Sequence, residues 1–227
     1  MRNIVKRTEP ASLTQHRLTP HSDYENYRDK DALREALVAE QRGLCCYCLQ
    51  AIKADGDKMK IEHWHSQDRY KDDPDERLLY WNLLAACKGN EGQPQADQHC
   101  DTFKGEKDLS RNPANPLHNV EALVHYLSAS GRIASSNPEF DAELNDVLNL
   151  NVAYLRNSRL GELRAFERML DKRPVLLSPS RANRRKVRQM WQTLLAEWEG
   201  DSNYGNLRPF CGVIIYWIKK KLARIPS

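Results

Sequence analysis

The hydrophobic positions of this chain recur with the 3.6-residue period of an α-helix in several long segments. In residues 29–42 the helical face consists of Leu33, Ala36, Leu37 and Glu40. Gly43 follows, as is typical of a residue that ends a helix. Residues 180–199 carry the clearest apolar stripe, made of Val187, Met190, Trp191, Leu194, Leu195 and Trp198. Weaker helical patterns cover residues 117–127, 140–150, 152–170 and 210–222.

Residues 45–107 differ, because Gly, Asp, Pro and Gln interrupt the hydrophobic pattern. A short alternating run at residues 59–64 predicts one β-strand there. The segment has too few apolar residues to form a stable core, so it needs a further source of stability. We therefore predict an α+β, predominantly helical fold with two regions. Residues 1–110 combine a helix with this poorly packed region, and residues 111–227 are helical.

The charge is unevenly distributed along the 227 residues. The whole chain has a net charge of +4, but residues 1–110 carry 17 basic and 20 acidic side chains, against 18 and 11 in residues 111–227. An acidic first half suits cation binding, and a basic second half suits a polyanion such as nucleic acid. No apolar run of about 18 residues occurs, and residues 1–20 do not resemble a signal peptide. We expect a cytoplasmic protein with no membrane partner.

The six cysteines are the first sign of specific chemistry. In a reducing compartment, clustered thiols indicate metal binding more often than disulfides. Cys45 and Cys48 form a C-x-x-C pair, and Cys87 and Cys100 can supply two more thiolates to a tetrahedral structural zinc site. Such a site would stabilise the poorly packed region. Free buried thiols are the alternative, and His99 is an alternative zinc ligand.

Between and after the cysteine pairs lie residues that suit phosphodiester hydrolysis. Glu62 and His63 are adjacent in the predicted strand, Asn82 lies in the sequence YWNLL, and Asp101 and Lys104 follow the last cysteine of the cluster. A neutral imidazole can accept a proton from water, and carboxylate oxygens bind divalent cations. Taken singly, each of these residues is more often an ordinary surface, turn or core residue.

The order C-x-x-C, EH, N-L, C, C-D-x-x-K resembles the HNH endonuclease motif. Within that family the chain is most similar to the PtuB-type nucleases of the Septu and retron antiphage systems, over residues 24–108 and more weakly to residue 172. The resemblance implies a small ββα-metal unit with a zinc knot, embedded in a helical domain. It also implies a metal-dependent endonuclease, with DNA the favoured substrate and RNA possible.

The resemblance assigns a role to each residue. His63 would be the general base that activates water, and Glu62 and Asp101 would hold a catalytic Mg²⁺ or Mn²⁺. Asn82 would orient His63, and Lys104 would contact a substrate phosphate. Glu62 replaces the aspartate of many HNH proteins, and Asp101 replaces the usual histidine or asparagine. Both replacements keep an oxygen ligand and favour hard cations over zinc at the catalytic position.

The resemblance also implies partners: a PtuA-type ATPase and, in the retron branch, a reverse transcriptase with its noncoding DNA. Arg184, Arg185 and Arg188 lie off the apolar stripe and are candidate nucleic-acid contacts, although a solvated helix face explains them equally well. Two other readings stay open at this point. The chain could be a non-catalytic zinc-knot module that binds nucleic acid, or a structural subunit of a larger complex.

Overall fold

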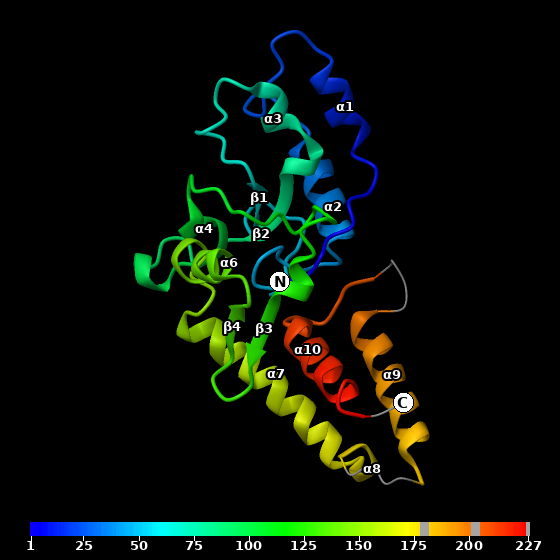
Figure 1. Ribbon diagram of the computed structural model, residues 1–227. Helices are drawn as coiled ribbons and strands as arrows, with labels where there is room; N and C mark the ends of the chain where they lie inside the picture. The colour runs from blue at the N-terminus through cyan, green and yellow to red at the C-terminus, as the bar shows by residue number, and fades with distance from the viewer. Residues whose placement is uncertain (178–181, 201–204, 226–227) are drawn as a thin grey trace.

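The computed structural model describes residues 1–177, 182–200 and 205–225 and has an α+β architecture. In Figure 1 the molecule is elongated, with β1, β2 and α1 to α4 in its upper part and α7 to α10 in its lower part. The described helices are α1 (Ala11–Arg17), α2 (Lys30–Glu40), α3 (Pro74–Leu78), α4 (Cys100–Lys104), α5 (Val120–Leu123), α6 (Pro138–Ala142), α7 (Ala153–Asp171), α8 (Pro174–Leu177), α9 (Arg184–Glu199) and α10 (Cys211–Leu222). The strands are β1 (Met59–His63), β2 (Leu83–Cys87), β3 (Val124–Leu127) and β4 (Arg132–Ser135), and the short helical turns are η1 (Tyr80–Asn82), η2 (Gln95–Asp97) and η3 (Glu143–Val147).

Four of the predicted helical patterns correspond to helices of the structure. Residues 29–42 contain α2, whose Leu33 and Leu37 are fully buried. The patterns at residues 152–170, 180–199 and 210–222 correspond to α7, α9 and α10. Ser180 and Arg181, at the start of the pattern in residues 180–199, lie outside the described residues. In α9, Val187, Trp191, Leu194 and Trp198 face the core, because they recur at the helical period.

Two weaker helical predictions were wrong in part. Within residues 117–127 only Val120–Leu123 is helical, and the chain then becomes strand β3, which pairs with β4 in an antiparallel hairpin. Val124 and Tyr126 are buried on alternate positions, as in a half-buried strand. Within residues 140–150, α6 passes into the π-helical turn η3, so the regular α-helix does not continue.

The first sheet consists of β1 and β2, which pair antiparallel with Met59 opposite Cys87 and His63 opposite Leu83. The strand predicted at residues 59–64 is therefore confirmed. The second strand was not predicted, because all five residues of Leu83–Cys87 are buried and show no alternation. Helix α4 packs against β2, so the sheet and a short helix form a small unit in the upper part of the molecule (Figure 1).

A buried ion pair fixes the N-terminal segment to this unit. Lys6 Nζ lies 2.5 Å from Glu40 Oε1, and both side chains are fully buried. Lys6 also donates to the carbonyl of Leu83 (2.8 Å), and the Tyr80 hydroxyl donates to Glu40 Oε2 (2.8 Å). The pair therefore connects the N-terminal segment, the end of α2 and the start of β2. Burial lowers the pKa of Lys6, which the Glu40 carboxylate partly offsets.

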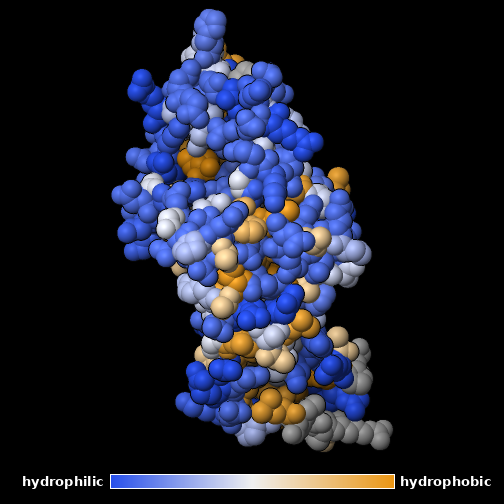
Figure 2. Space-filling view, turned by 90° about the vertical axis from the view of Figure 1, so that its left-hand side faces the viewer, coloured by the Kyte–Doolittle hydropathy of each residue, from blue (hydrophilic) through white to orange (hydrophobic). Residues whose placement is uncertain are grey.

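The buried apolar residues form one cluster that extends from Met1 to Ile225 and draws on both predicted regions. The division at residue 110 stays a prediction. On the face drawn in Figure 2, hydrophobic side chains are scattered among hydrophilic ones rather than gathered in one broad patch. In the part of the chain that the structure describes, no helix has the length and apolar character needed to cross a membrane.

Candidate metal centre and active site

Four buried cysteines converge on one point, as the sequence predicted. Cys45 and Cys48 lie in the turn after α2, Cys87 ends β2 and Cys100 begins α4, and their ligand atoms all lie within 4.8 Å of one another. The Sγ atoms of Cys45 and Cys100 are 3.9 Å apart, and those of Cys48 and Cys87 are 3.8 Å apart. Four sulfurs around zinc at about 2.3 Å are separated by about 3.8 Å along each tetrahedral edge. The group can therefore hold a metal ion such as zinc.

Backbone geometry closes the long loop between Cys87 and Cys100. Gly89 has φ +54°, and a Cβ at this position would lie 1.9 Å from the carbonyl oxygen of His99, so only glycine fits. The carbonyl of Gly89 accepts a hydrogen bond from the amide of His99 (3.0 Å), and the amide of Cys100 donates to Leu148 (2.8 Å). These contacts bring Cys100 to the C-x-x-C pair across the twelve intervening residues.

His99 lies beside the cysteine group and is not a member of it. Its Nδ1 is 3.2 Å from the sulfur of Cys100 and 4.0 Å from that of Cys87, so the ring can donate a hydrogen bond to a thiolate. The geometry therefore favours four cysteine ligands over a set in which His99 replaces one. Cys46 and Cys211 also lie outside the group, and none of the six cysteines forms a disulfide.

Two carboxylates meet where β1 approaches α4. Glu62 is 2% exposed, and it lines the same cleft as Asp101. The Tyr47 hydroxyl donates to Glu62 Oε1 (2.7 Å), and Lys104 Nζ lies 2.9 Å from the same oxygen. Burial, and after it the Asp101 carboxylate, raises the pKa of Glu62 well above its usual value, against the opposing effect of Lys104. Paired carboxylates of this kind offer oxygen ligands to a divalent cation.

His63, the last residue of β1, is held by its ring nitrogen Nε2. This nitrogen donates to the carbonyl oxygen of Arg77 (3.1 Å), so the neutral ring carries its hydrogen on Nε2 and leaves Nδ1 as an acceptor. The ring of Tyr24 packs edge-on against the imidazole, with centroids 4.4 Å apart. Burial lowers the pKa of His63 to about 4, so the ring is neutral near pH 7.

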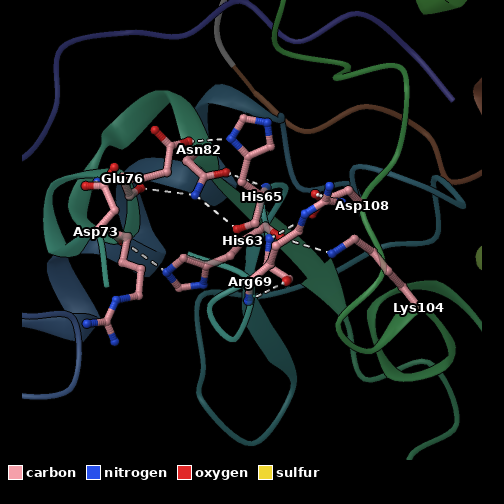
Figure 3. Close-up of polar contacts among 10 residues, drawn as sticks. His63, His65, Arg69, Asp73, Glu76, Asn82, Lys104 and Asp108 are labelled. Carbon is pink, nitrogen blue, oxygen red and sulfur yellow. Dashed lines mark hydrogen bonds and ion pairs between the residues drawn. The ribbon is translucent and has the colours of Figure 1, made fainter. Parts of the chain in front are cut away.

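Asn82 holds the backbone that follows His63 (Figure 3). Its side chain accepts from the amide of His65 (2.7 Å) and donates to the carbonyls of His65 (3.2 Å) and Glu76 (3.1 Å). Its own carbonyl accepts from the amide of Trp64 (2.9 Å). Glu76 precedes Arg77, whose carbonyl receives the His63 ring. Asn82 therefore links the residues after His63 to the segment that fixes the imidazole.

The side chain of Lys104 is buried rather than open to solvent. Its Nζ donates to the carbonyl of His63 (3.0 Å) and pairs with Glu62, as Figure 3 shows for the first of these contacts. The residue is only 2% exposed. Lys104 thus connects α4 to the end of β1, and its charge lies next to a buried carboxylate.

His65 has a different environment from His63. Its Nδ1 lies 2.6 Å from Glu76 Oε1, and its ring stacks on that of Tyr70 with centroids 4.6 Å apart. Figure 3 shows this ring on the opposite side of Asn82 from the ring of His63. The structure thus separates two histidines that are two residues apart in the sequence.

A cleft of about 470 Å³ is lined by Glu62, His63, Asp101 and Lys104. It also receives basic side chains that the sequence pattern did not single out: Arg34 from α2, Lys60 from β1 and Lys88 after β2. Lys60 Nζ lies 2.8 Å from Glu91 and 3.5 Å from Asp101. Arg34 lies on the polar flank of a predicted helix, where nothing in the sequence distinguishes it from a solvated charge.

Helix α9, which carries the basic residues of the sequence prediction, lies in the lower part of the molecule, whereas β1 and α4, which supply residues of the cleft, lie in its upper part (Figure 1). The guanidinium of Arg188 donates to the carbonyls of Leu222 (3.3 Å) and Ile225 (2.7 Å), so it satisfies the C-terminal end of α10. Arg184 and Arg185 lie in the first turn of α9, where Arg185 is exposed and Arg184 is half-buried. A role for these residues in nucleic-acid binding stays a prediction.

In comparisons with known proteins, the chain matches no protein-family model and no curated protein. The case for a function therefore rests on the residues and on their geometry.

Proposed function

We propose that this protein is a metal-dependent endonuclease of the HNH type. The observation that carries the proposal is the meeting of Glu62, Asp101 and a neutral His63 in one cleft where β1, β2 and α4 come together. Two strands, a short helix and a cysteine group are the parts that a ββα-metal unit with a zinc knot would contain, which supports the proposal.

The donor set fits a hard divalent cation. Tyr47 and Lys104 both bind Oε1 of Glu62, so the other oxygen, Oε2, is left to bind a cation together with Asp101. Mg²⁺ or Mn²⁺ bound here would supply Lewis-acid stabilisation of the negative charge that develops on the phosphate. A bound divalent cation would also offset the repulsion between the two carboxylates, since the Asp101 carboxylate raises the pKa of Glu62.

His63 acts as the general base through Nδ1. The hydrogen bond from Nε2 to Arg77 fixes the tautomer and the ring orientation, so Nδ1 can take a proton from water that attacks phosphorus. A phosphodiester bound beside the ring brings negative charge, which raises the pKa of an imidazole and makes it a stronger base. Lys104 positions the carbonyl of His63 and the carboxylate of Glu62. The basic residues of the cleft that contact the phosphates of the substrate are Arg34, Lys60 and Lys88.

The biological role follows from the resemblance to PtuB-type nucleases. The protein acts as the effector of a bacterial antiphage system together with a PtuA-type ATPase, and in the retron branch with a reverse transcriptase and its noncoding DNA. DNA is the favoured substrate, because metal-assisted attack of water needs no 2′-hydroxyl. A structured RNA is the alternative polymer.

The test is cleavage of supercoiled plasmid and of total RNA, with and without Mg²⁺ or Mn²⁺ and with and without the ATPase. Glu62→Gln and Asp101→Asn should each lose activity by about 10²-fold or more, because removing a preorganised charged group from an active site commonly has an effect of that size. Asp97→Asn is the matched control, since Asp97 is exposed and does not line the cleft. Zinc content should be unchanged in all three variants. Nucleic-acid binding without cleavage under every condition would instead indicate a non-catalytic zinc-stabilised module.

A further inference from the structure

Two lysines at the edge of the candidate cleft hold a single carboxylate between them. Lys60 Nζ lies 2.8 Å from Oε1 of Glu91, and Lys88 Nζ lies 3.4 Å from Oε2 of the same residue. Both lysines line the cleft that contains Glu62 and Asp101, and Glu91 does not. One negative group therefore bridges two positive groups in the space where the substrate would bind.

Thr102 holds the two lysines in place independently of Glu91. Its hydroxyl accepts a hydrogen bond from Lys60 Nζ (3.0 Å) and donates to the backbone carbonyl of Lys88 (2.8 Å). Thr102 belongs to α4, Lys60 lies in β1 and Lys88 follows β2 directly. Lys60 Nζ also lies 3.5 Å from Oδ2 of Asp101. The elements that supply the candidate metal ligands thus also fix the two lysines beside them.

Glu91 itself is held more loosely. It lies in the turn after β2, where its amide donates to the carbonyl of Lys88 (2.9 Å), and 49% of its side chain is exposed. In the part of the chain that the structure describes, the two lysines are the partners of its carboxylate. Exposed ion pairs contribute little to stability. Rotation of this one side chain would therefore free both lysines and leave their contacts with Thr102 intact.

A phosphodiester has the chemistry to take the place of this carboxylate. Both groups present two oxygens that share one negative charge, and a lysine ammonium binds either of them as a point charge. The position of the carboxylate between Lys60 and Lys88 therefore marks where one phosphate group would fit. Because Lys60 also lies next to Asp101, that phosphate would adjoin the candidate metal site.

We infer that Lys60 and Lys88 form one phosphate subsite of the cleft, and that Glu91 is its internal occupant, which the substrate displaces. The inference rests on the proposed function for the identity of the ligand, a nucleic-acid phosphodiester, and adds a subsite and a residue that weakens binding to it. A nucleic acid also contacts other cations of the cleft, such as Arg34, so it gains more interactions than the displaced carboxylate loses.

The experiment measures binding of a fluorescently labelled DNA duplex and of a labelled structured RNA, without added Mg²⁺ or Mn²⁺. Glu91→Gln should tighten binding by about 3–10-fold, because the substrate no longer has to break two surface ion pairs. Lys88→Met should weaken binding and lower the slope of log Kd against log salt concentration by about one, the effect of losing one phosphate contact. Asp97→Asn is the matched control, since it removes one negative charge from the same loop at an exposed position. It should change the affinity by less than about twofold, because salt screens an exposed charge that is not in contact with the substrate.

A general effect of net charge would make Asp97→Asn tighten binding as much as Glu91→Gln does, and that result would overturn the inference. Wild-type affinity of Glu91→Gln, or a wild type that binds neither polymer, would overturn it as well. The outcome is separate from the cleavage test, because no catalytic cation is added. Tighter binding by Glu91→Gln without cleavage by the wild type would support the subsite and contradict the nuclease. Cleavage by the wild type with unchanged binding in Glu91→Gln would support the nuclease and contradict the subsite.

Discussion

Replacing Cys48 by serine removes one of the four sulfurs that converge in the structure. Cys48 is 3% exposed, and its sulfur lies 3.8 Å from that of Cys87, at the separation expected for two ligands of one zinc ion. A serine hydroxyl is not ionised near pH 7, so it cannot replace the thiolate. The chain offers a matched control in Cys46, which is equally buried and lies two residues away but outside the cysteine group.

The size of the effect follows from what a structural zinc contributes. Apparent binding free energies of such sites are about 10–16 kcal/mol, so one of four equal ligands accounts for about 2.5–4 kcal/mol. At about 1.4 kcal/mol per tenfold change, Cys48→Ser should raise the Kd for zinc by about 10²–10³-fold. A folded domain has a net stability of about 5–15 kcal/mol, so the loss of zinc should also destabilise the region around the cysteines.

The assay measures zinc content after dialysis against a chelator, together with thermal unfolding. The wild type and Cys46→Ser should each retain one zinc per chain, although Cys46→Ser loses some stability because a buried hydroxyl replaces the thiol. Cys48→Ser should lose its zinc and melt at a lower temperature than the wild type. The reasoning would be refuted if Cys48→Ser kept zinc with wild-type affinity, or if Cys46→Ser lost it to the same degree.

Two further predictions concern the packing around the sheet and the loop. Glu40→Gln leaves the ammonium group of Lys6 buried without its carboxylate partner, so it should lower the free energy of unfolding by about 3–5 kcal/mol in chemical denaturation. Glu35→Gln, at an exposed site of α2, is the control and should change the free energy of unfolding by less than about 0.5 kcal/mol. Equal effects of the two variants would show that the ion pair contributes nothing. Gly89→Ala places a methyl group against the carbonyl oxygen of His99, so it should reduce zinc retention in the dialysis assay. Zinc retention at the wild-type level would contradict the close approach of Gly89 to His99.

The elements that the sequence predicted well are those with one apolar face. The stripe in residues 180–199 and the alternation at residues 59–64 each correspond to an element, because a half-buried helix or strand shows its period in the sequence. Strand Leu83–Cys87 is buried on both faces and shows no period. The hairpin β3–β4 was missed because Val124 and Tyr126 fit a weak helical pattern, and their pairing with β4 depends on contacts that a local pattern does not contain.

The cysteine group was predictable because the chemistry of clustered thiols is specific, even though the pair Cys87 and Cys100 is widely spaced. What the spacing could not show was the turn at Gly89 that closes the loop. Charged residues were harder to interpret. Lys104 and Arg159 are both 2% exposed, although lysines and arginines are usually solvated. Their burial depends on partners from distant segments, namely Glu62 in β1 and the carbonyls of Gly131 and Leu150.

The central claim is that His63 is the general base of a nuclease, and His65 supplies the internal control. The measurement is the initial rate of plasmid nicking with Mn²⁺ and the ATPase for the wild type, His63→Ala and His65→Ala, at equal zinc content. We predict that His63→Ala slows nicking by about 10²–10⁴-fold. His65→Ala should stay within a few-fold of the wild-type rate, because the His65 ring is bound to Glu76 and lies away from the His63 ring. Nicking by His63→Ala at the wild-type rate, an equal loss in both variants, or no cleavage by the wild type would contradict the account.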